Sequence, residues 1–246
     1  MRSVCIVLVS LFAATISAQS GSTESAGRDD PDRLYAGRTD IGRARRAADL
    51  WSGALRRNSQ DFDAAWKLSR ADYWLGGHTP EAERRQFLES GVDAGRAAVA
   101  SAPNRPEGHF WLAANMGAIA ESYGVRAGLK YRKPVKDELE TILRIAPSFM
   151  QGSADRVLGR WYFKVPALLG GSRKLAEEHL RASLKYNPNS TVSHVFLAEL
   201  LIAERREAEA RAELQAALAA PFDPEWDPEN QEYQQKARAL LATLKP

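Results

Sequence analysis

The stretch that decides the fold is VKDELETILRIAP, residues 135–147. Val135, Leu139 and Ile142 are spaced by four and then three positions, which places them on one face of a helix. Pro147 follows five positions later and ends that helix. The same spacing recurs in four other places. They are Ala47, Trp51, Ala54 and Ser59; Gly91, Gly95, Ala98 and Pro103; Ala176, Leu180, Ser183 and Pro188; and, more loosely, Ala210, Leu214, Ala217 and Phe222.

This recurrence predicts an all-α fold. The helix stops at residues 59, 103, 147, 188 and 222 are 44, 44, 41 and 34 residues apart, so each interval holds one helical hairpin. No segment shows the sustained apolar–polar alternation of a strand. We therefore expect an α-solenoid of stacked helical hairpins, with Pro228–Leu244 as a C-terminal capping helix.

The first residues have the layout of a secretory signal peptide, which we place at residues 1–18. An apolar run from Val4 to Ile16 is too short to span a membrane and is followed by the small residues Ser17 and Ala18. The alternative is an uncleaved N-terminal anchor. The single cysteine, Cys5, lies inside the apolar run, so no lipid-anchoring cysteine follows it. We expect a periplasmic or secreted protein with no stable membrane span after cleavage.

The remaining chain divides into a polar linker at residues 19–35 and a helical-repeat domain at residues 36–246. The linker is rich in Ser, Gly and Asp and lacks a packing face. Within the repeat domain, the basic segment Gly124–Pro134 is expected to be a long loop or a distorted turn. The helices expected after Ile41–Leu55 and Asp61–Gly76 are Thr79–Ala102, Pro106–Tyr123, Val135–Ala146, Ser148–Val165, Ser172–Tyr186, Ser190–Ala203 and Arg206–Ala219.

The charge balance argues against nucleic acid as a partner. There are 34 basic and 31 acidic residues, giving a net charge of +3, and the two signs are interleaved. Four histidines lie far apart in no metal-binding spacing, and His109 and His194 are expected to pack or hydrogen-bond at helix starts. The expected signal cleavage would remove the only cysteine, and there is no G-x-S-x-G nucleophile elbow. We predict no catalytic residues, no metal, no cofactor and no enzymatic activity.

The hairpins resemble tetratricopeptide repeats, whose first helix carries W-x2-L-G-x2-Y and whose second carries A-x3-F-x2-A-x4-P. Trp66 and Tyr73 match the aromatic ends of the first-helix motif. Residues 158–162 match its middle and end with Leu158, Gly159 and Tyr162. A further echo is Leu197, Ala198 and Leu201. The resemblance covers about residues 40–222.

A narrower resemblance links four blocks of the chain. They are His109–Phe110–Trp111 with Asn115 and Gly117, LGRWY at 158–162, LLGGS at 168–172 and PFDPEW at 221–226. Together they look like the T component, TatT, of tripartite ATP-independent periplasmic transporters. The H-x-W and G-R-W blocks are similar, more distantly, to regulator of microtubule dynamics proteins. TatT members are often lipoproteins, and this chain lacks the anchoring cysteine.

The TatT resemblance implies an exported helical-repeat protein, often oligomeric, that cooperates with a substrate-binding protein and binds an apolar ligand. In tetratricopeptide repeats, positions 2, 5, 9 and 12 of each first helix face the concave groove. With Trp66, Phe110, Asp155 and His194 at position 4, this register points a defined set of residues into the groove. They are Lys67, Trp74, Trp111, Asn115, Arg156, Arg160, Phe163 and Glu199.

Such a groove suits a carboxylate-bearing ligand or an extended peptide. Arginine binds carboxylates in bidentate geometry, and aromatic rings bury apolar area. The alternative is that the rings belong to the core between helices and the arginines form ion pairs. We expect a non-enzymatic periplasmic accessory of a solute transport system that binds a partner protein or a small amphipathic ligand. The alternative function is a general protein–protein adaptor in envelope assembly.

Overall fold

The computed structural model describes residues 30–244, and within that range the chain forms eleven α-helices, one short 3-10 helix and no strand. The all-α prediction is confirmed. The expected signal peptide and the linker up to residue 29 lie outside the described residues. The elements are α2 (Pro31–Ala36), α3 (Ile41–Arg57), α4 (Phe62–His78), α5 (Glu81–Ser101), α6 (Pro106–Ser122), α7 (Gly124–Ile145), α8 (Ser153–Lys164), η1 (Ala167–Leu169), α9 (Arg173–Tyr186), α10 (Thr191–Ala203), α11 (Glu207–Ala219) and α12 (Asp227–Thr243).

The four–three–five pattern lies on the odd-numbered helices from α3 to α11, as expected. Leu139, Ile142, Leu180 and Leu214 are completely buried. Each of these helices ends two or three residues before the predicted stop, as α7 does at Ile145 before Pro147. The pattern is therefore the seam through which each second helix packs against its neighbours.

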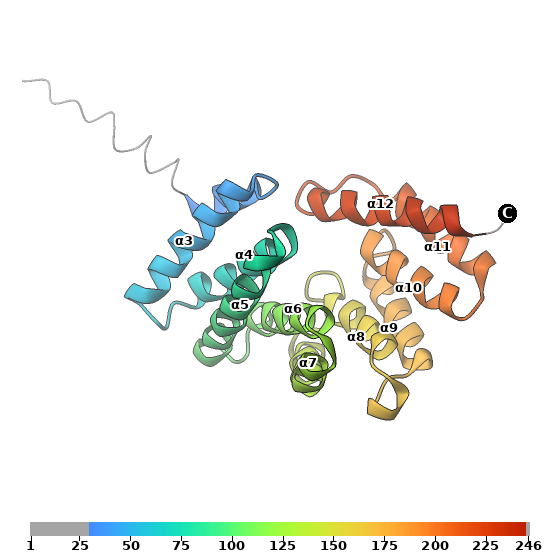
Figure 1. The fold of residues 1–246 in the computed structure, drawn as a ribbon, viewed down its shortest axis with the longest axis horizontal. Coiled ribbons are helices and arrows are strands. Elements are labelled where there is room, and N and C mark those ends of the chain that lie inside the picture. The colour runs from blue at the N-terminus through green and yellow to red at the C-terminus, as the bar shows by residue number, and fades with distance from the viewer. Residues whose placement is uncertain (1–29, 245–246) are drawn as a thin grey trace, which may run out of the picture.

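The even-numbered helices are the first helices of the hairpins, and they lie along the inner side of a curved array. Figure 1 shows the two ends of this curve approaching each other, with the blue helices at the start of the array next to the beginning of the red α12. The close packing of α5 against α6 depends on Gly95, because a Cβ there would lie 2.9 Å from the Cα of Leu112. Helix α12 follows the last hairpin and covers it, which confirms a capping helix.

The linker boundary differs from the prediction, because α2 occupies residues assigned to the linker. The side chain of Asp30 accepts a hydrogen bond from the amide of Asp32, and Pro31 takes the first helical position. Tyr35 is buried, with its ring 5.9 Å from that of Trp51. A cap and one buried aromatic side chain thus order a short helix in a polar stretch.

The expected loop at Gly124–Pro134 is helical, so that expectation is wrong. It forms the first turns of α7, which continues through Pro134. Proline usually interrupts a helix because it lacks an amide hydrogen. Here Tyr131 is buried, and the indole of Trp161 donates a 2.9 Å hydrogen bond to the carbonyl of Arg132. Tertiary contacts on both sides therefore hold the segment in helical form.

Helix α8 begins later than the expected Ser148. The chain first makes a turn in which Met150, Gln151 and Gly152 have φ values of 43°, 57° and 76°. This left-handed region is unfavourable for side chains other than glycine, so the turn interrupts any helix started at Ser148.

Contacts between residues far apart in the sequence close the array. Arg38 pairs with Glu229 of α12, with its Nη2 2.5 Å from Oε2 and its Nε 3.0 Å from Oε1, and it also donates to the carbonyl of Glu225. His78 at the end of α4 contacts Glu232. Arg38 is only 5% exposed, so this contact is sheltered from solvent screening.

His109 and His194 occupy equivalent places in two hairpins. The Nε2 of each contacts the carbonyl of a preceding proline, Pro103 at 2.9 Å and Pro188 at 2.8 Å. The Nδ1 of each contacts a glutamate of the second helix, Glu138 or Glu213. Burial alone would lower the pKa of both histidines, but the glutamate and carbonyl partners outweigh it and raise the pKa. The expected hydrogen-bonding role of these histidines is confirmed.

None of the helices between residues 30 and 244 combines the length and apolar character that crossing a membrane requires.

Arg38→Ala is expected to lower the free energy of unfolding by about 2 kcal/mol, because it leaves Glu229 half-buried without its cation. Urea unfolding followed by circular dichroism measures the change. Arg181→Ala, which removes an exposed ion pair to Glu177 on α9, is the control and should cost well under half as much. Equal losses would contradict a structural role for the closing contact.

The two histidines are expected to make stability fall as pH rises above about 6.5. Their folded pKa is raised, so their contribution is complete below the unfolded pKa and is lost as pH rises through the folded pKa. A neutral imidazole can donate only one of its two hydrogen bonds, which costs about 1.5 kcal/mol per histidine. Urea unfolding at pH 6 and pH 9 should show a smaller difference for the His109→Gln, His194→Gln double variant than for wild type. An identical pH slope in both proteins would refute this assignment.

Candidate functional site

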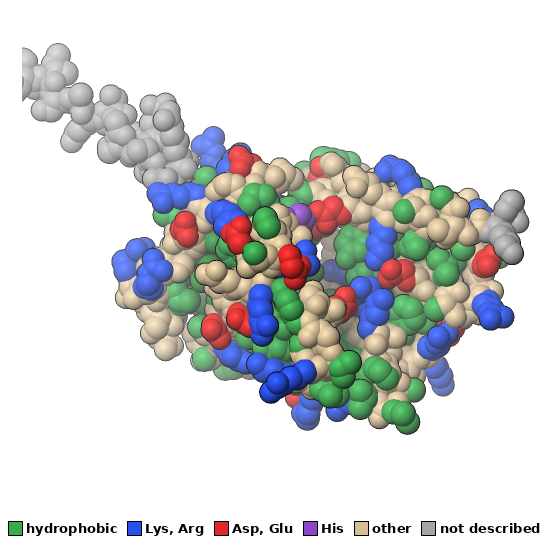
Figure 2. Space-filling view, in the orientation of Figure 1, with side chains coloured by type: hydrophobic (Ala, Val, Ile, Leu, Met, Phe, Trp, Pro, Cys, Tyr) green, Lys and Arg blue, Asp and Glu red, His purple; other side chains and the backbone are tan. Residues whose placement is uncertain are grey.

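The curved array encloses a hollow that we call the central cavity. Its volume is about 330 Å³, and it is lined by the inner faces of α2, α4, α6, α8, α10 and α12. Figure 2 shows the surface hollowed between the two halves of the ring. The lining residues are Tyr35, Tyr73, Trp74, Phe110, Trp111, Ala113, Ala114, Gly117, Ala118, Glu121, Ser122, Met150, Arg156, Val157, Arg160, Val192, Phe196, Trp226, Glu229 and Tyr233. The expected concave groove is therefore present, as a hollow inside the curved array.

Aromatic rings dominate the cavity wall. Trp111 contacts Phe110 edge to face at 5.0 Å between ring centroids and contacts Tyr73 at 5.8 Å. On the opposite side, Phe196 of α10 meets Tyr233 of α12 at 5.5 Å. These rings hold one another in place, so the wall presents a rigid apolar surface to an occupant.

Arg156 is the cation of the wall that has no carboxylate partner. Among residues 30–244, no carboxylate oxygen lies within ion-pair distance of its guanidinium. Burial lowers the pKa of Arg156, and only the hydroxyls of Tyr233 and Tyr73 oppose that effect. The side chain is half-buried among the rings and remains charged, since the ordinary pKa of arginine is far above neutrality. An anion entering the cavity would therefore meet an unneutralised guanidinium.

Arg160 lies one helical turn from Arg156, and its charge is already paired with carboxylates. It makes two hydrogen bonds to Glu121, of 2.9 and 3.0 Å, and a third of 3.0 Å to Glu199. Its guanidinium also lies 4.5 Å from the centroid of the Phe196 ring. Burial opposes the charge, but Glu121 and Glu199 raise the pKa of Arg160 above its usual value. Arg160 thus lines the cavity as a structural cross-link between α6, α8 and α10.

The eight predicted groove residues divide into two sets. Trp74, Trp111, Arg156 and Arg160 line the central cavity, whereas Lys67, Asn115, Phe163 and Glu199 do not. That any of them contacts a ligand stays a prediction. The residues of the second set have other roles in the structure. For them, the repeat register does not predict which side chains line the cavity.

Asn115 is completely buried between helices. Its amide donates to the carbonyls of Ser69 and Trp111, both at 2.9 Å, so it joins α6 to α4. Lys67 pairs with Asp32 of α2 at 2.6 Å. Both side chains therefore connect neighbouring helices and do not line the cavity.

Glu199 and Phe163 also lie off the cavity. Burial would raise the pKa of Glu199, but Lys236 at 2.7 Å together with Arg160 keeps it lowered. This chain of charges ties α12 to α10 and α8. Phe163 is half-buried and packs against the main hydrophobic core.

The register missed the residues that α2 and α12 bring to the cavity. Tyr35, Trp226, Glu229 and Tyr233 line it because the array closes on itself. No short-range spacing in the sequence signals that closure. Among the described residues, no group of three His, Cys, Asp or Glu side chains could hold a metal ion.

Solved structures with the same overall fold include a TPR protein and MamA. A thermophilic TPR protein from Thermus thermophilus is 24% identical, with a TM-score of 0.65 over 86% of this chain and 97% of that chain. MamA is 12% identical, with a TM-score of 0.51 over 81% of this chain and 95% of that chain. These likenesses establish the tetratricopeptide-like solenoid.

No curated protein sequence matches the chain. A family model does match it, over residues 30–181. That range covers more than half of the chain and includes both the H-x-W and G-R-W blocks. The protein therefore belongs to the family described as Regulator of microtubule dynamics protein 1-3.

Proposed function

We propose that this protein is a non-enzymatic scaffold whose central cavity holds a carboxylate-bearing segment of a partner protein. The observation that carries the proposal is Arg156, a half-buried guanidinium without a carboxylate in the wall of an aromatic cavity. A partly desolvated charge is costly unless it is paired. A carboxylate from a ligand supplies the missing partner, and bidentate pairing with arginine adds orientation.

The aromatic wall supports the same proposal. Trp111, Phe196 and Tyr233 line the same cavity as Arg156, and Trp74 lines it from α4. An occupant with an anionic group and an adjoining apolar group satisfies both surfaces at once. A volume of about 330 Å³ holds a few side chains rather than a folded domain. The end of a polypeptide fits that size.

We also propose that the scaffold works outside the cytoplasm, as a TatT-like accessory of a solute transport system. The support is the signal-peptide pattern of residues 1–18 and the sequence blocks shared with TatT. The partner would then be a periplasmic substrate-binding protein. Co-purification from envelope extract tests this role, since a general adaptor would enrich unrelated envelope proteins instead.

Arg156→Met tests the site itself. The variant is expected to lose capture of the partner by about tenfold or more, because the carboxylate is left without its cation. The same change is expected to raise the free energy of unfolding of the free protein by about 1 kcal/mol, because it removes an uncompensated half-buried charge. Quantitative mass spectrometry of proteins captured from envelope extract measures the first effect, and urea unfolding measures the second.

The matched control is Arg181→Met, which removes an exposed arginine outside the cavity. Its capture should equal that of wild type. Native mass spectrometry of the purified protein tests for a small-molecule ligand instead of a peptide. A small molecule that wild type retains and Arg156→Met lacks would show that the cavity binds an amphipathic ligand. Unchanged capture by Arg156→Met with no retained molecule would refute the proposed site.

A further inference from the structure

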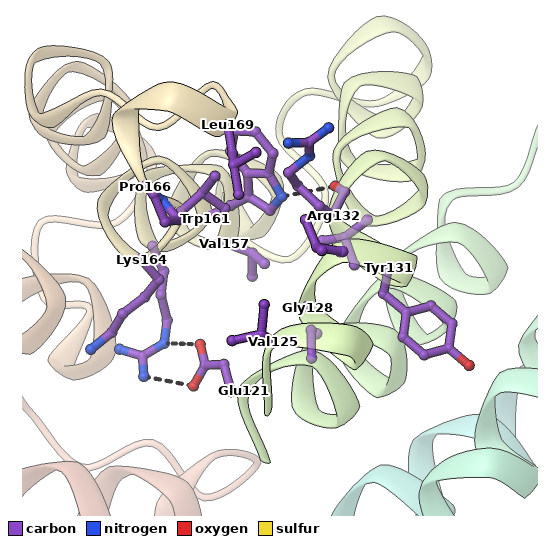
Figure 3. A pocket seen from close by; sticks show the side chains of 16 residues that line it. Glu121, Val125, Gly128, Tyr131, Arg132, Val157, Trp161, Lys164, Pro166 and Leu169 are labelled. Carbon is purple, nitrogen blue, oxygen red and sulfur yellow. Dashed lines mark hydrogen bonds and ion pairs between the residues drawn. The ribbon is translucent and has the colours of Figure 1, made fainter. Parts of the chain in front are cut away.

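A second cavity lies beside the central cavity, between two neighbouring hairpins, and we call it the lateral groove. Its volume is about 440 Å³, and it runs between α7 on one side and α8 with η1 on the other. Figure 3 shows Trp161, Pro166 and Leu169 on one wall and Val125 and Gly128 on the other, with Val157 between them. One wall is thus built by the basic segment 124–134, which forms the first turns of α7.

The rim of the lateral groove carries apolar side chains that no part of the described chain covers. Leu169 of η1 is 37% exposed, Val125 is 79% exposed and Leu129 is 51% exposed. Val125 and Leu129 are four residues apart and share one face of α7. Exposed aliphatic side chains beside an apolar cavity are typical of a surface that binds a partner.

Cations without carboxylate partners flank the same groove. Arg132 and Lys164 line it from α7 and α8. Neither forms an ion pair with a described residue, although Lys164 lies 5.3 Å from the Phe163 ring. The nearby Lys133 is different, because it pairs with Asp137 at 2.6 Å. The groove therefore offers an apolar floor with unneutralised positive charge on both walls.

Two glycines keep the groove open. A Cβ added at Gly117 would meet nothing within 4 Å, and one at Gly128 would meet only the carbonyl of Ala120 at 3.8 Å. Both positions are helical, where alanine is the more favourable residue. The space above them is therefore free for side chains that come from outside.

We propose that the lateral groove binds an amphipathic helix of a partner protein that carries acidic residues beside its apolar face. Apolar side chains at i, i+3, i+4 and i+7 of that helix fill the groove, and carboxylates on its flanks meet Arg132 and Lys164. The two-walled concave shape favours a helix over a flat lipid surface, which would leave the groove unfilled. The groove adjoins the central cavity and shares Glu121 and Arg160 with it, but the exposed apolar residues and the two cations line the groove alone, so its partner need not be the same one.

Fluorescence anisotropy with a labelled synthetic helix tests the proposal on the full-length protein. The probe is a peptide of about 18 residues, or five helical turns, with leucines on one face and glutamates on both flanks. A second peptide replaces every glutamate with lysine. The acidic peptide is expected to bind and the basic one to bind at least about tenfold more weakly.

Two variants locate the binding. Gly128→Leu fills the groove, and Lys164→Glu reverses one of its charges. Each variant is expected to bind the acidic peptide about tenfold more weakly. Lys185→Glu on α9 makes the same charge change on an exposed lysine away from the groove and should leave binding unchanged. Arg156→Met should also leave it unchanged, so failure here is separate from failure of the central-cavity proposal. Circular dichroism checks that each variant is folded.

Several results would overturn the proposal. They are equal binding of the acidic and basic peptides, wild-type binding by Lys164→Glu, and no binding of the acidic peptide by wild type. A fourth result combines two observations: the acidic peptide does not bind, and the wild-type protein co-sediments with phosphatidylglycerol vesicles whereas Lys164→Glu does not. That result would assign the surface to a membrane.

Discussion

The closing contact between Arg38 and Glu229 is the constraint on which the rest of the site depends. A stack of hairpins curves whether or not its ends meet, and an open curve would expose a shallow groove. Because Arg38 holds α12 against the beginning of the chain, Tyr35 and Tyr233 lie on the same cavity. The cavity then has aromatic surfaces on opposite sides, and Arg156 lies between them with no carboxylate to neutralise it. Ring closure thus turns the concave face into a partly enclosed cavity.

The sequence predicted those features that depend on neighbouring residues. The spacing of Val135, Leu139 and Ile142 indicated a buried helix face, and all three are buried as expected. Helix periodicity and a following proline are local signals, so they identified the second helices and their ends. The same reasoning was wrong at segment 124–134, where the buried Tyr131 outweighs the local preference of Pro134.

The site was only partly predictable because its residues come from distant parts of the chain. The repeat register pointed Trp111 and Arg156 into the groove, and both line the cavity, but it also pointed Asn115 there, and that side chain joins two helices instead. Nothing in the sequence separated Arg156 from Arg160. The difference lies in Glu121 and Glu199, which are both 39 residues from Arg160 and reach it only in the folded protein. A cation's availability is therefore a property of the tertiary structure.

The central cavity and the lateral groove meet at the ion pair between Arg160 and Glu121, which lines both. The two cavities also share Gly117 and Val157, so one scaffold carries two adjoining, partly open cavities. The segment that builds the groove wall is also part of the extra length that separates this array from a regular 34-residue repeat. The added turns of α7 thus form one wall of the groove without disturbing the ring.

Ring closure in solution is the most direct test of this account. Nitroxide labels at Thr39→Cys and Gln235→Cys, both exposed positions, report the distance between the start of the array and α12 in a Cys5→Ser background. Double electron–electron resonance should give one narrow distance distribution, which Arg38→Ala broadens. A broad distribution in the protein with Arg38 intact would mean that the ends of the array separate, and it would contradict an enclosed central cavity.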